Sequence, residues 1–374
     1  MRQVLSGMSL LLILVLCDCG NSQEESSQTT EIDTLVIEVN NSIGIEYGDS
    51  CYVFGEIITI RDNSHGSILI LDRIKSQVAE YDSTGTFSFV AARAGSGPGE
   101  LLRPIDFDLN DHDEVMILDM MKGQILSYSD DGEFLEIAEV YSDMPPLKIN
   151  IGSDQYLLSL NIGQNVNENG ALSLYASLDL RHFGREHQQN LWSSSFAMDP
   201  SAPEAMYYSS VLALVYDLDS QGNIYLANTA FDKFHLLSYD ANCALRWEIE
   251  QSVDPMEKTP HELANEQELV RSLAQRFGGS INHEFSPPAY REVIQDIDVD
   301  SNDRIWVRNG LQNRPVFDVY TASGELLGTV LVRIPEEQGS TDWEFEIDHS
   351  ISCFSINPED YPRVLQCGTV NLLI

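Results

Sequence analysis

Short apolar stretches alternate with polar turns along most of the chain, which is the pattern of β-strands joined by tight connections. The segment 67–87 is matched without a gap by the segment 114–134, an offset of 47 residues, and Leu-Asp, Tyr, Gly and Phe occupy the same places in both. Each copy predicts a strand, an Asp-led turn, a second strand and a glycine-containing turn into a third strand. The chain is therefore predicted to repeat one strand-rich unit.

A second pair of segments shows the same unit further along the chain. The segment 219–226 matches 300–307 at an offset of 81 residues, and 109–117 fills the same place in the earlier copies. The extra length is an insertion at about 254–288, in which the stretch from Pro260 to Phe277 carries apolar residues at helical spacing. We expect an apolar face of this helix to dock on the sheets.

With a fainter unit at 148–180, five units can be counted, centred near residues 70, 117, 160, 225 and 306. The sixth is expected to combine Thr34–Val39 with strands at 351–356 and 363–373, because joining both ends of the chain closes a ring without exposed sheet edges. The predicted fold class is all-β: one six-bladed β-propeller at 32–374 with four-stranded antiparallel blades and a helical insertion before the fifth countable blade. A two-domain α/β enzyme would need alternating helices, which the pattern lacks.

The N-terminus has the features of an export signal. Arg2 precedes an apolar run, Met8–Leu16, that is too short to span a bilayer and is followed by Cys17 and a polar stretch. This arrangement resembles a bacterial lipoprotein signal, which implies a signal peptide at 1–17, lipid attachment at Cys17 and a flexible tether at 18–31. The expected location is the cell envelope, with the membrane contacted through the lipid only. Cleavage and secretion without a lipid, or an uncleaved anchor, are the alternatives.

The segment Ala94–Pro104 (AGSGPGELLRP) resembles the glycine-rich start of an NHL repeat, and the strand and hairpin after it complete that repeat. Together with the lipoprotein-like signal, it is similar to six-bladed β-propeller lipoproteins of Bacteroidetes-type and related bacteria. The segment 294–307 is similar to a late blade of those proteins, so the resemblance covers about residues 34–335. It implies the fold and assigns no activity.

The composition is strongly acidic, with a formal net charge of −38. Such a surface repels phosphate backbones, so nucleic-acid binding is not expected. Its negative electrostatic field would attract a cation or a basic partner instead. A monomer is expected. Four cysteines remain after the signal segment, and free buried thiols are favoured over disulfides; they are Cys51, Cys243, Cys353 and Cys367.

No familiar catalytic motif is present, so catalytic residues stay unassigned. The segments 217–222 and 298–303 resemble the opening of a calcium loop, but neither supplies the later glutamate, and both occupy the turn position of the repeat. We therefore assign no metal ligand and expect no cofactor, with calcium or another divalent ion as the alternative.

The loop at 94–104 is bordered by Arg93, Glu100 and Arg103, which we predict to lie at one face of the central channel, where the two arginines would form an anion-binding spot. Salt bridges to nearby carboxylates are the alternative for these residues.

The predicted function is a non-enzymatic binding or interaction module at the envelope, with an unknown protein or glycan partner. One alternative is a metal-dependent hydrolase or lyase similar to propellers of the gluconolactonase and amidating-lyase types, which three or more ligand groups converging in the channel would indicate. The other is polysaccharide binding through exposed aromatics such as Trp192 or Tyr207.

Overall fold

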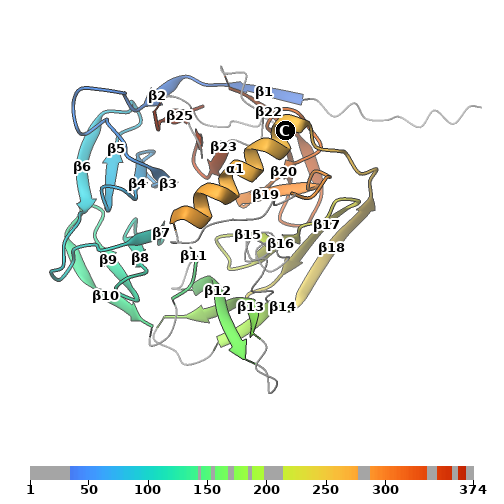
Figure 1. Cartoon of the computed structure of the whole chain (residues 1–374), viewed down its shortest axis with the longest axis horizontal. Coiled ribbons are helices and arrows are strands. Elements are labelled where there is room, and N and C mark those ends of the chain that lie inside the picture. Colours follow the sequence, from blue (N-terminus) through green and yellow to red (C-terminus); the bar gives the residue numbers. More distant parts are fainter. Residues whose placement is uncertain are drawn as a thin grey trace, which may run out of the picture. The chain divides into compact units, whose positions relative to one another are not determined.

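The structure is a computed structural model, and it describes residues 34–141, 145–152, 156–166, 172–183, 188–197, 214–276, 287–334, 343–355 and 361–367. The signal peptide, the tether and Cys17 lie outside these residues and stay predictions. The described strands form six sheets arranged around a centre (Figure 1). The predicted fold class, a six-bladed β-propeller with four-stranded antiparallel blades, is confirmed.

We number the blades by the order of their first strands. Blade 1 holds β3 (Ile57–Asp62), β4 (Ile68–Asp72), β5 (Gln77–Tyr81) and β6 (Phe87–Ala92). Blade 2 holds β7 (Pro104–Leu109), β8 (Val115–Asp119), β9 (Gln124–Tyr128) and β10 (Phe134–Val140). Blade 3 holds β11 (Lys148–Gly152), β12 (Tyr156–Val166), β13 (Leu172–His182) and β14 (Gln188–Ala197).

The later blades follow the same order. Blade 4 holds β15 (Leu214–Leu218), β16 (Ile224–Asn228), β17 (Lys233–Tyr239) and β18 (Leu245–Ser252). Blade 5 holds β19 (Ile294–Val299), β20 (Ile305–Asn309), β21 (Val316–Tyr320) and β22 (Leu326–Arg333), with β1 (Thr34–Glu38) added at its outer edge. Blade 6 holds β23 (Trp343–Ile347), β24 (Ile351–Ser355), β25 (Val364–Gln366) and β2 (Asn41–Ile43).

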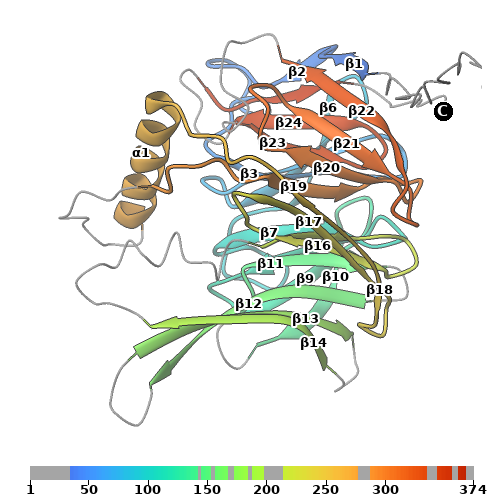
Figure 2. The same ribbon diagram turned by 90° about the vertical axis from the view of Figure 1, so that its right-hand side faces the viewer.

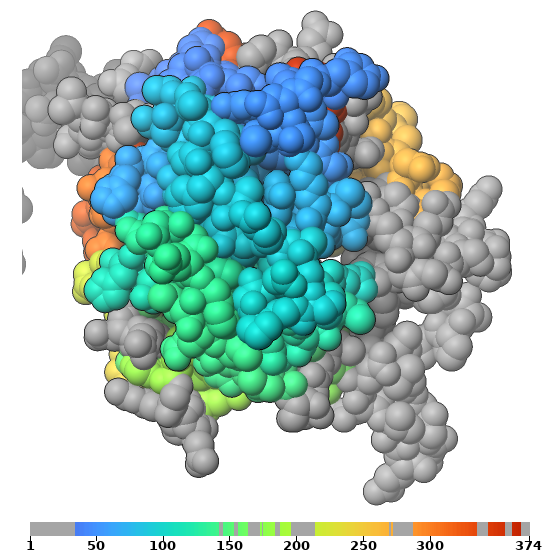
Figure 3. Space-filling view, turned by 90° about the vertical axis from the view of Figure 1, so that its left-hand side faces the viewer, coloured from blue at the N-terminus to red at the C-terminus, as the bar shows by residue number. Residues whose placement is uncertain are grey.

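The first strand of each blade is the inner one. The inner strands β3, β7, β11, β15, β19 and β23 contact one another in this order, and β23 in turn contacts β3. Apolar residues form six buried clusters, and each cluster joins side chains of two neighbouring blades. The core is thus a closed ring of six layers, and Figure 3 shows the outer surface that blades 1 and 2 form together.

The ring is closed by both ends of the chain, as predicted, but by a different N-terminal strand. The closing strand is β2, which runs antiparallel to β25 and completes blade 6. The expected closing segment, Thr34–Val39, instead contains β1, which pairs in parallel with β22 of blade 5. The connection between β1 and β2 lies between the two blades: the Asn40 amide donates to the Gln366 carbonyl at 2.8 Å.

The recurring residues of the repeat hold each blade together. The carboxylate of Asp72 accepts a hydrogen bond from the Gly55 amide at 2.8 Å, and Asp119 accepts one from the Leu102 amide at 2.6 Å, so each aspartate ties the crossover before its blade to its second strand. The turn glycines Gly85 and Gly132 have φ angles of +79° and +83°, a region that side chains with a Cβ rarely adopt.

Neighbouring blades are also connected at the turns that follow their inner strands. The Ser64 amide of blade 1 donates to the Asp113 carboxylate of blade 2 at 2.9 Å, and the Ser220 amide of blade 4 donates to Asp303 of blade 5 at 3.0 Å. Both aspartates have a left-handed backbone, with φ near +58°. The repeat therefore encodes contacts between blades as well as within them.

The insertion contains the helix α1 (Pro260–Arg276), which lies on one face of the propeller, across the centre of the ring (Figures 1 and 2). Thr259 and Glu262 exchange hydrogen bonds between side chain and backbone at its N-terminus, which is a capping box. Of the apolar residues expected to dock this helix, only Leu263 has a described side chain, which is half-buried, so the apolar docking stays a prediction. Ion pairs fix it there: Glu262 with Arg291 at 2.8 Å and Glu266 with Lys258 at 2.5 Å.

Within the described residues, no helix combines the length and the apolar composition needed to cross a membrane. The four described cysteines are free thiols, and two of them, Cys353 and Cys367, are buried in blade 6.

Candidate functional site

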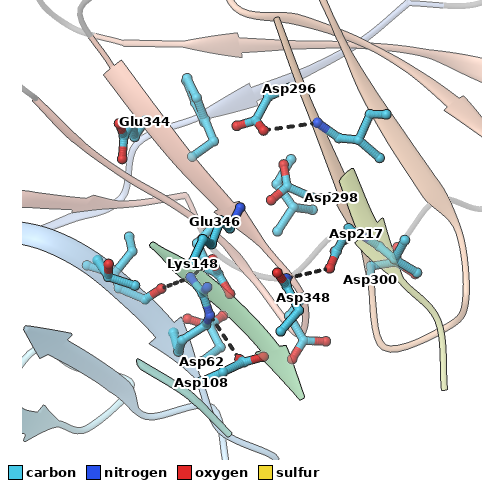
Figure 4. Close-up of a pocket in the computed structure, with 18 of the residues that line it drawn as sticks. Asp62, Asp108, Lys148, Asp217, Asp296, Asp298, Asp300, Glu344, Glu346 and Asp348 are labelled. Atoms are coloured by element: carbon cyan, nitrogen blue, oxygen red, sulfur yellow. Dashed lines mark hydrogen bonds and ion pairs between the residues drawn. The ribbon is translucent and has the colours of Figure 1, made fainter. Parts of the chain in front are cut away.

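A cavity of about 900 Å³ occupies the centre of the ring and is lined by all six inner strands. Successive side chains of a strand point to opposite faces, so alternate residues of each inner strand reach this cavity. Most of them are charged, and Figure 4 shows several from different blades around the same space. The titratable groups on the inner strands are Arg61, Asp62, Asp106, Asp108, Lys148, Asp217, Asp296, Asp298, Glu344 and Glu346.

Three of these carboxylates bind the backbone of the next blade. Asp106 accepts a hydrogen bond from the Ile149 amide at 2.8 Å, and Asp108 accepts one from the Ile151 amide at 2.6 Å. Asp217 accepts one from the Val299 amide at 2.7 Å. An inner strand has no further strand on its channel side, so these carboxylates satisfy amides that would otherwise lack a partner.

A second set of contacts joins side chains across blades. Arg61 of blade 1 pairs with Asp108 of blade 2 at 3.0 Å and with Glu346 of blade 6 at 2.8 Å. The Asn150 amide group donates to Asp217 at 3.0 Å. The polar side chains of blades 1 to 4 are therefore largely engaged in holding the ring together.

The wall formed by blades 5 and 6 is different. Asp298 and Glu344 form no hydrogen bond or ion pair with any of the described residues, and Asp296 accepts only from the amide of the next residue, Ile297, at 3.0 Å. We call Asp296, Asp298, Glu344 and the neighbouring Arg308 the blade 5–6 cluster. Its carboxylates form few contacts with the rest of the described protein.

Arg308 comes from β20, directly opposite Asp296 in the sheet, and is 5% exposed. One terminal nitrogen, Nη1, donates to the Trp343 carbonyl at 2.6 Å, whereas Nε and Nη2 have no partner among the described residues. A second cation, Lys148 of blade 3, places its Nζ 5.3 Å from the centre of the Tyr216 ring and forms no ion pair with the described residues.

Burial raises the pKa of the channel carboxyl groups, because a charge is less stable away from bulk water. The pKa of Asp217 rises to about 7 through burial, which Lys148 partly opposes. That of Glu344 also rises to about 7, through burial and then the charge of Asp296. The pKa of Asp298 rises well above its usual range, through burial and then the carboxylates around it. Part of the channel wall is therefore protonated at neutral pH.

These shifts predict that the folded protein loses stability as the pH rises. Asp62 lines the same cavity, and burial raises its pKa to about 7 as well. Between the ordinary value of 3.8 and about 7, the folded state binds protons that the unfolded state has lost, so the free energy of unfolding falls with pH by roughly 1.4 kcal/mol per pH unit for each titrating group. Urea unfolding between pH 4.5 and 8 measures this slope.

The matched control for the pH slope is Asp217→Asn, which keeps an oxygen acceptor and cannot titrate. The free energy of unfolding of this variant should fall less steeply with pH than that of the wild type. The acidic surface contributes equally to both slopes and so does not affect the comparison. A wild-type stability that rises from pH 5 to pH 7 would contradict the assignment. We assign no stability to Glu344: the channel walls surround it, but its side chain remains accessible to solvent through the cavity.

The criterion for a divalent metal site is three ligand groups that meet at one point. Among the described His, Cys, Asp and Glu residues, only His235, Glu248 and Glu250 bring ligand atoms within 4.8 Å of one another. These three lie on the outer strands β17 and β18 of blade 4. The channel carboxylates do not meet the criterion among the described residues. In the turns that resemble calcium loops, Asp219 and Asp300 bind their own turn amides instead.

The residues predicted at the channel face lie in the crossover between β6 and β7. None of Arg93, Glu100 and Arg103 lines the cavity. The Glu100 carboxylate accepts from the Gly97 amide at 2.7 Å, and the Arg103 amide donates to the Asp119 carboxylate, so these contacts shape the loop. Anion binding there stays a prediction, at a place outside the cavity.

The aromatic residues considered for glycan binding are not in the channel either. Trp192 lies on β14, an outer strand, and is partly buried against the core between blades 3 and 4. Tyr207 lies outside the described residues.

The model of the DUF5128 family, which is described as a 6-bladed beta-propeller, matches residues 22–158. This is less than half of the chain, and it agrees with the architecture described above. No curated protein matches the chain significantly.

Several solved structures are similar in outline. One is a protein of Bacteroides fragilis described as exported, which is 13% identical in sequence. The match covers 91% of this chain and 100% of that chain, with a TM-score of 0.43. A DUF4221 family member from Bacteroides vulgatus shows 9% identity, 88% and 96% coverage, and a TM-score of 0.47. Virginiamycin B lyase from Staphylococcus aureus shows 9% identity, 88% and 99% coverage, and a TM-score of 0.45. We base no functional conclusion on these similarities.

Proposed function

We propose that this propeller is an exported binding protein whose central channel holds a small hydrophilic ligand carrying an amine. The observation that supports this most directly is the set of polar atoms in the channel wall that lack a partner among the described residues. They include oxygens of Asp62, Asn150, Gln295 and Asp298, beside donor nitrogens of Arg308 and Trp343. Asp62 and Asn150 are 4% and 6% exposed. Buried acceptors without donors are costly, so a ligand rich in N–H groups would stabilise them.

The charge of the channel favours the same ligand. Eight carboxyl groups on the inner strands face two cations on the same strands, Arg61 and Lys148, and Arg61 is occupied by two of those carboxylates. The net charge of −38 adds a long-range attraction for cations. A protonated amine would offer three donors and one positive charge to the blade 5–6 cluster.

The test is calorimetric titration of the purified mature protein with 1,4-diaminobutane and with 1,4-butanediol, which has the same length and no charge. The diamine should bind and the diol should not. Asp298→Asn should weaken diamine binding about tenfold or more, since a bound ammonium favours the ionised form of Asp298 and hydrogen bonds to charged groups contribute about 1.5–3 kcal/mol. Glu248→Gln, with the same charge change on an outer strand, should leave it unchanged.

Diamine binding should also strengthen from pH 6 to pH 8. A proton on Asp217 or Glu344 competes with the bound cation, and the pKa of each group is about 7. Equal binding of the diol and the diamine, or an Asp298→Asn variant with wild-type affinity, would show that the channel holds water or neutral polyols only.

A lyase or hydrolase acting in the channel is the second candidate function. The observation in its favour is that carboxyl groups with a pKa of about 7 can transfer protons at neutral pH. Mass spectrometry of ligands recovered after incubation with the protein distinguishes the two functions: an unchanged ligand supports binding, and a new product supports an enzyme.

The proposed location is the cell envelope, through a lipid on Cys17. The support is the N-terminal sequence, with its short apolar run followed by a cysteine and a polar stretch. Intact-mass measurement of membrane-extracted protein should give an acylated chain that begins at Cys17, and a mature chain that begins elsewhere would refute the anchor.

A further inference from the structure

The channel wall also contains a buried arginine, Arg308, that the described residues satisfy only in part. Two nitrogens on one edge of its guanidinium group, Nε and Nη2, are buried and have no partner among the described residues. No other described side chain that lines the cavity has two such nitrogens. The group is held in place by its Nη1 bond to the Trp343 carbonyl at 2.6 Å and by the Phe345 ring, whose centre is 4.9 Å from Cζ. Its free edge is therefore fixed.

That edge has a particular chemical use. Nε and Nη2 point in nearly parallel directions, and this is the arrangement that binds both oxygens of a carboxylate at once. No carboxylate of the described residues does so: Nε and Nη2 have no partner, although Asp296 lies opposite Arg308 in the sheet. A buried guanidinium that lacks two partners is costly, and this points to a ligand group with two acceptor oxygens.

We propose that Arg308 binds the carboxylate end of the channel ligand, so that the ligand is a zwitterion with an ammonium group at Asp298 and Glu344 and a carboxylate at Arg308. This rests on the proposed amine-binding function and extends it to the opposite end of the same molecule. A carboxylate fits better than a phosphate, because a second negative charge would face Asp296 and Glu344. Lys148, whose charge also acts on Asp296, adds to the positive potential there.

The experiment compares ligands that differ at one end only. Unbranched ω-amino acids with two to six carbons are titrated into the full mature protein beside diamines of the same lengths. At the best length, the amino acid should bind about tenfold or more tightly than its diamine, because only its carboxylate pairs with Arg308. Because this comparison uses the wild type, it does not depend on whether any variant folds.

The variant Arg308→Met should remove this preference, so that the amino acid no longer binds more tightly than its diamine, and Arg308→Lys should restore part of it. Arg333→Met, at an exposed ion pair with Glu38, is the matched control and should leave the preference unchanged. Near-ultraviolet circular dichroism checks that each variant is folded.

Three outcomes would overturn the inference. Diamines that bind as tightly as the amino acids at every length would leave the amine-binding function standing and remove the role of Arg308. If aminoalkyl phosphates bound more tightly than every amino acid, the ligand group at Arg308 would be a dianion and not a carboxylate. Failure of both diamines and amino acids to bind would refute the proposed function as well.

Discussion

Replacing Arg61 with methionine should lower the free energy of unfolding by about 3–5 kcal/mol, the usual effect of removing one partner of a buried ion pair. The Arg61 side chain is 13% exposed and pairs with Asp108 at 3.0 Å and Glu346 at 2.8 Å. It thereby connects blades 6, 1 and 2 at the side of the ring where the closing blade meets the first. Without it, two carboxylates would be left close together inside the channel.

Urea unfolding at pH 8 and pH 5 measures this effect. The loss should be smaller at pH 5, because Asp108 and Glu346 have raised pKa values and can take up protons once the arginine is gone. Arg333→Met is the control, since its ion pair with Glu38 is more than half exposed and should contribute at most about 1 kcal/mol. A loss below about 1 kcal/mol in Arg61→Met would mean that the ring does not depend on this contact.

Replacing Ile43 with aspartate should cost about 4 kcal/mol or more, because it puts an unpaired charge into the core and detaches the strand that closes the ring. Ile43 lies on β2, is 1% exposed and belongs to the cluster between blades 6 and 1. Once β2 is displaced, β25 becomes a free edge that can pair with another chain. We therefore expect both a lower unfolding midpoint in urea and a larger particle in light scattering.

The control for ring closure is Leu35→Asp on β1, the added strand of blade 5. Leu35 is 39% exposed, so the substitution should change stability by no more than about 1 kcal/mol. If the two variants lose equal stability, β2 is not the strand on which closure depends.

Much of this fold follows from local residue patterns. The Leu-Asp and Gly positions of the repeat predict the second strand and the turn correctly, because Asp72 and Asp119 bind crossover amides and Gly85 and Gly132 need a positive φ. The place of β1 could not be predicted in this way. Its five residues would fit the edge of blade 5 or blade 6, and only the packing of the closed ring decides between them.

The charged residues that face the channel do follow a recognisable pattern in the sequence. The inner strands read polar, apolar, polar, as in DFD at 106–108, DID at 296–298 and EFE at 344–346. On an inner strand this alternation places two charges in the channel and one apolar side chain in the core. The resemblance of 217–222 and 298–303 to calcium loops marked the right segments for another reason: Asp217 and Asp298 face the cavity, whereas Asp219 and Asp300 hold turns.

The hydrogen-bond or ion-pair partner of each channel residue cannot be predicted from the sequence. Asp108 and Asp298 occupy matching places in their blades, yet Asp108 binds Arg61 and the Ile151 amide, whereas Asp298 Oδ2 binds no described residue. The difference depends on side chains from other blades, which are close only after the ring has closed. Arg308 was missed for a related reason, since it lies on a second strand, where the pattern predicts burial.

The unequal engagement of the channel wall bears on how such a protein could diversify. In blades 1 to 4 each polar side chain that binds the next blade is committed to the scaffold, so a mutation there would be selected against whatever the ligand. Asp296, Asp298, Glu344 and Arg308 carry few such commitments. A lineage could therefore acquire a new ligand by substitutions confined to blades 5 and 6, while the rest of the ring is inherited unchanged.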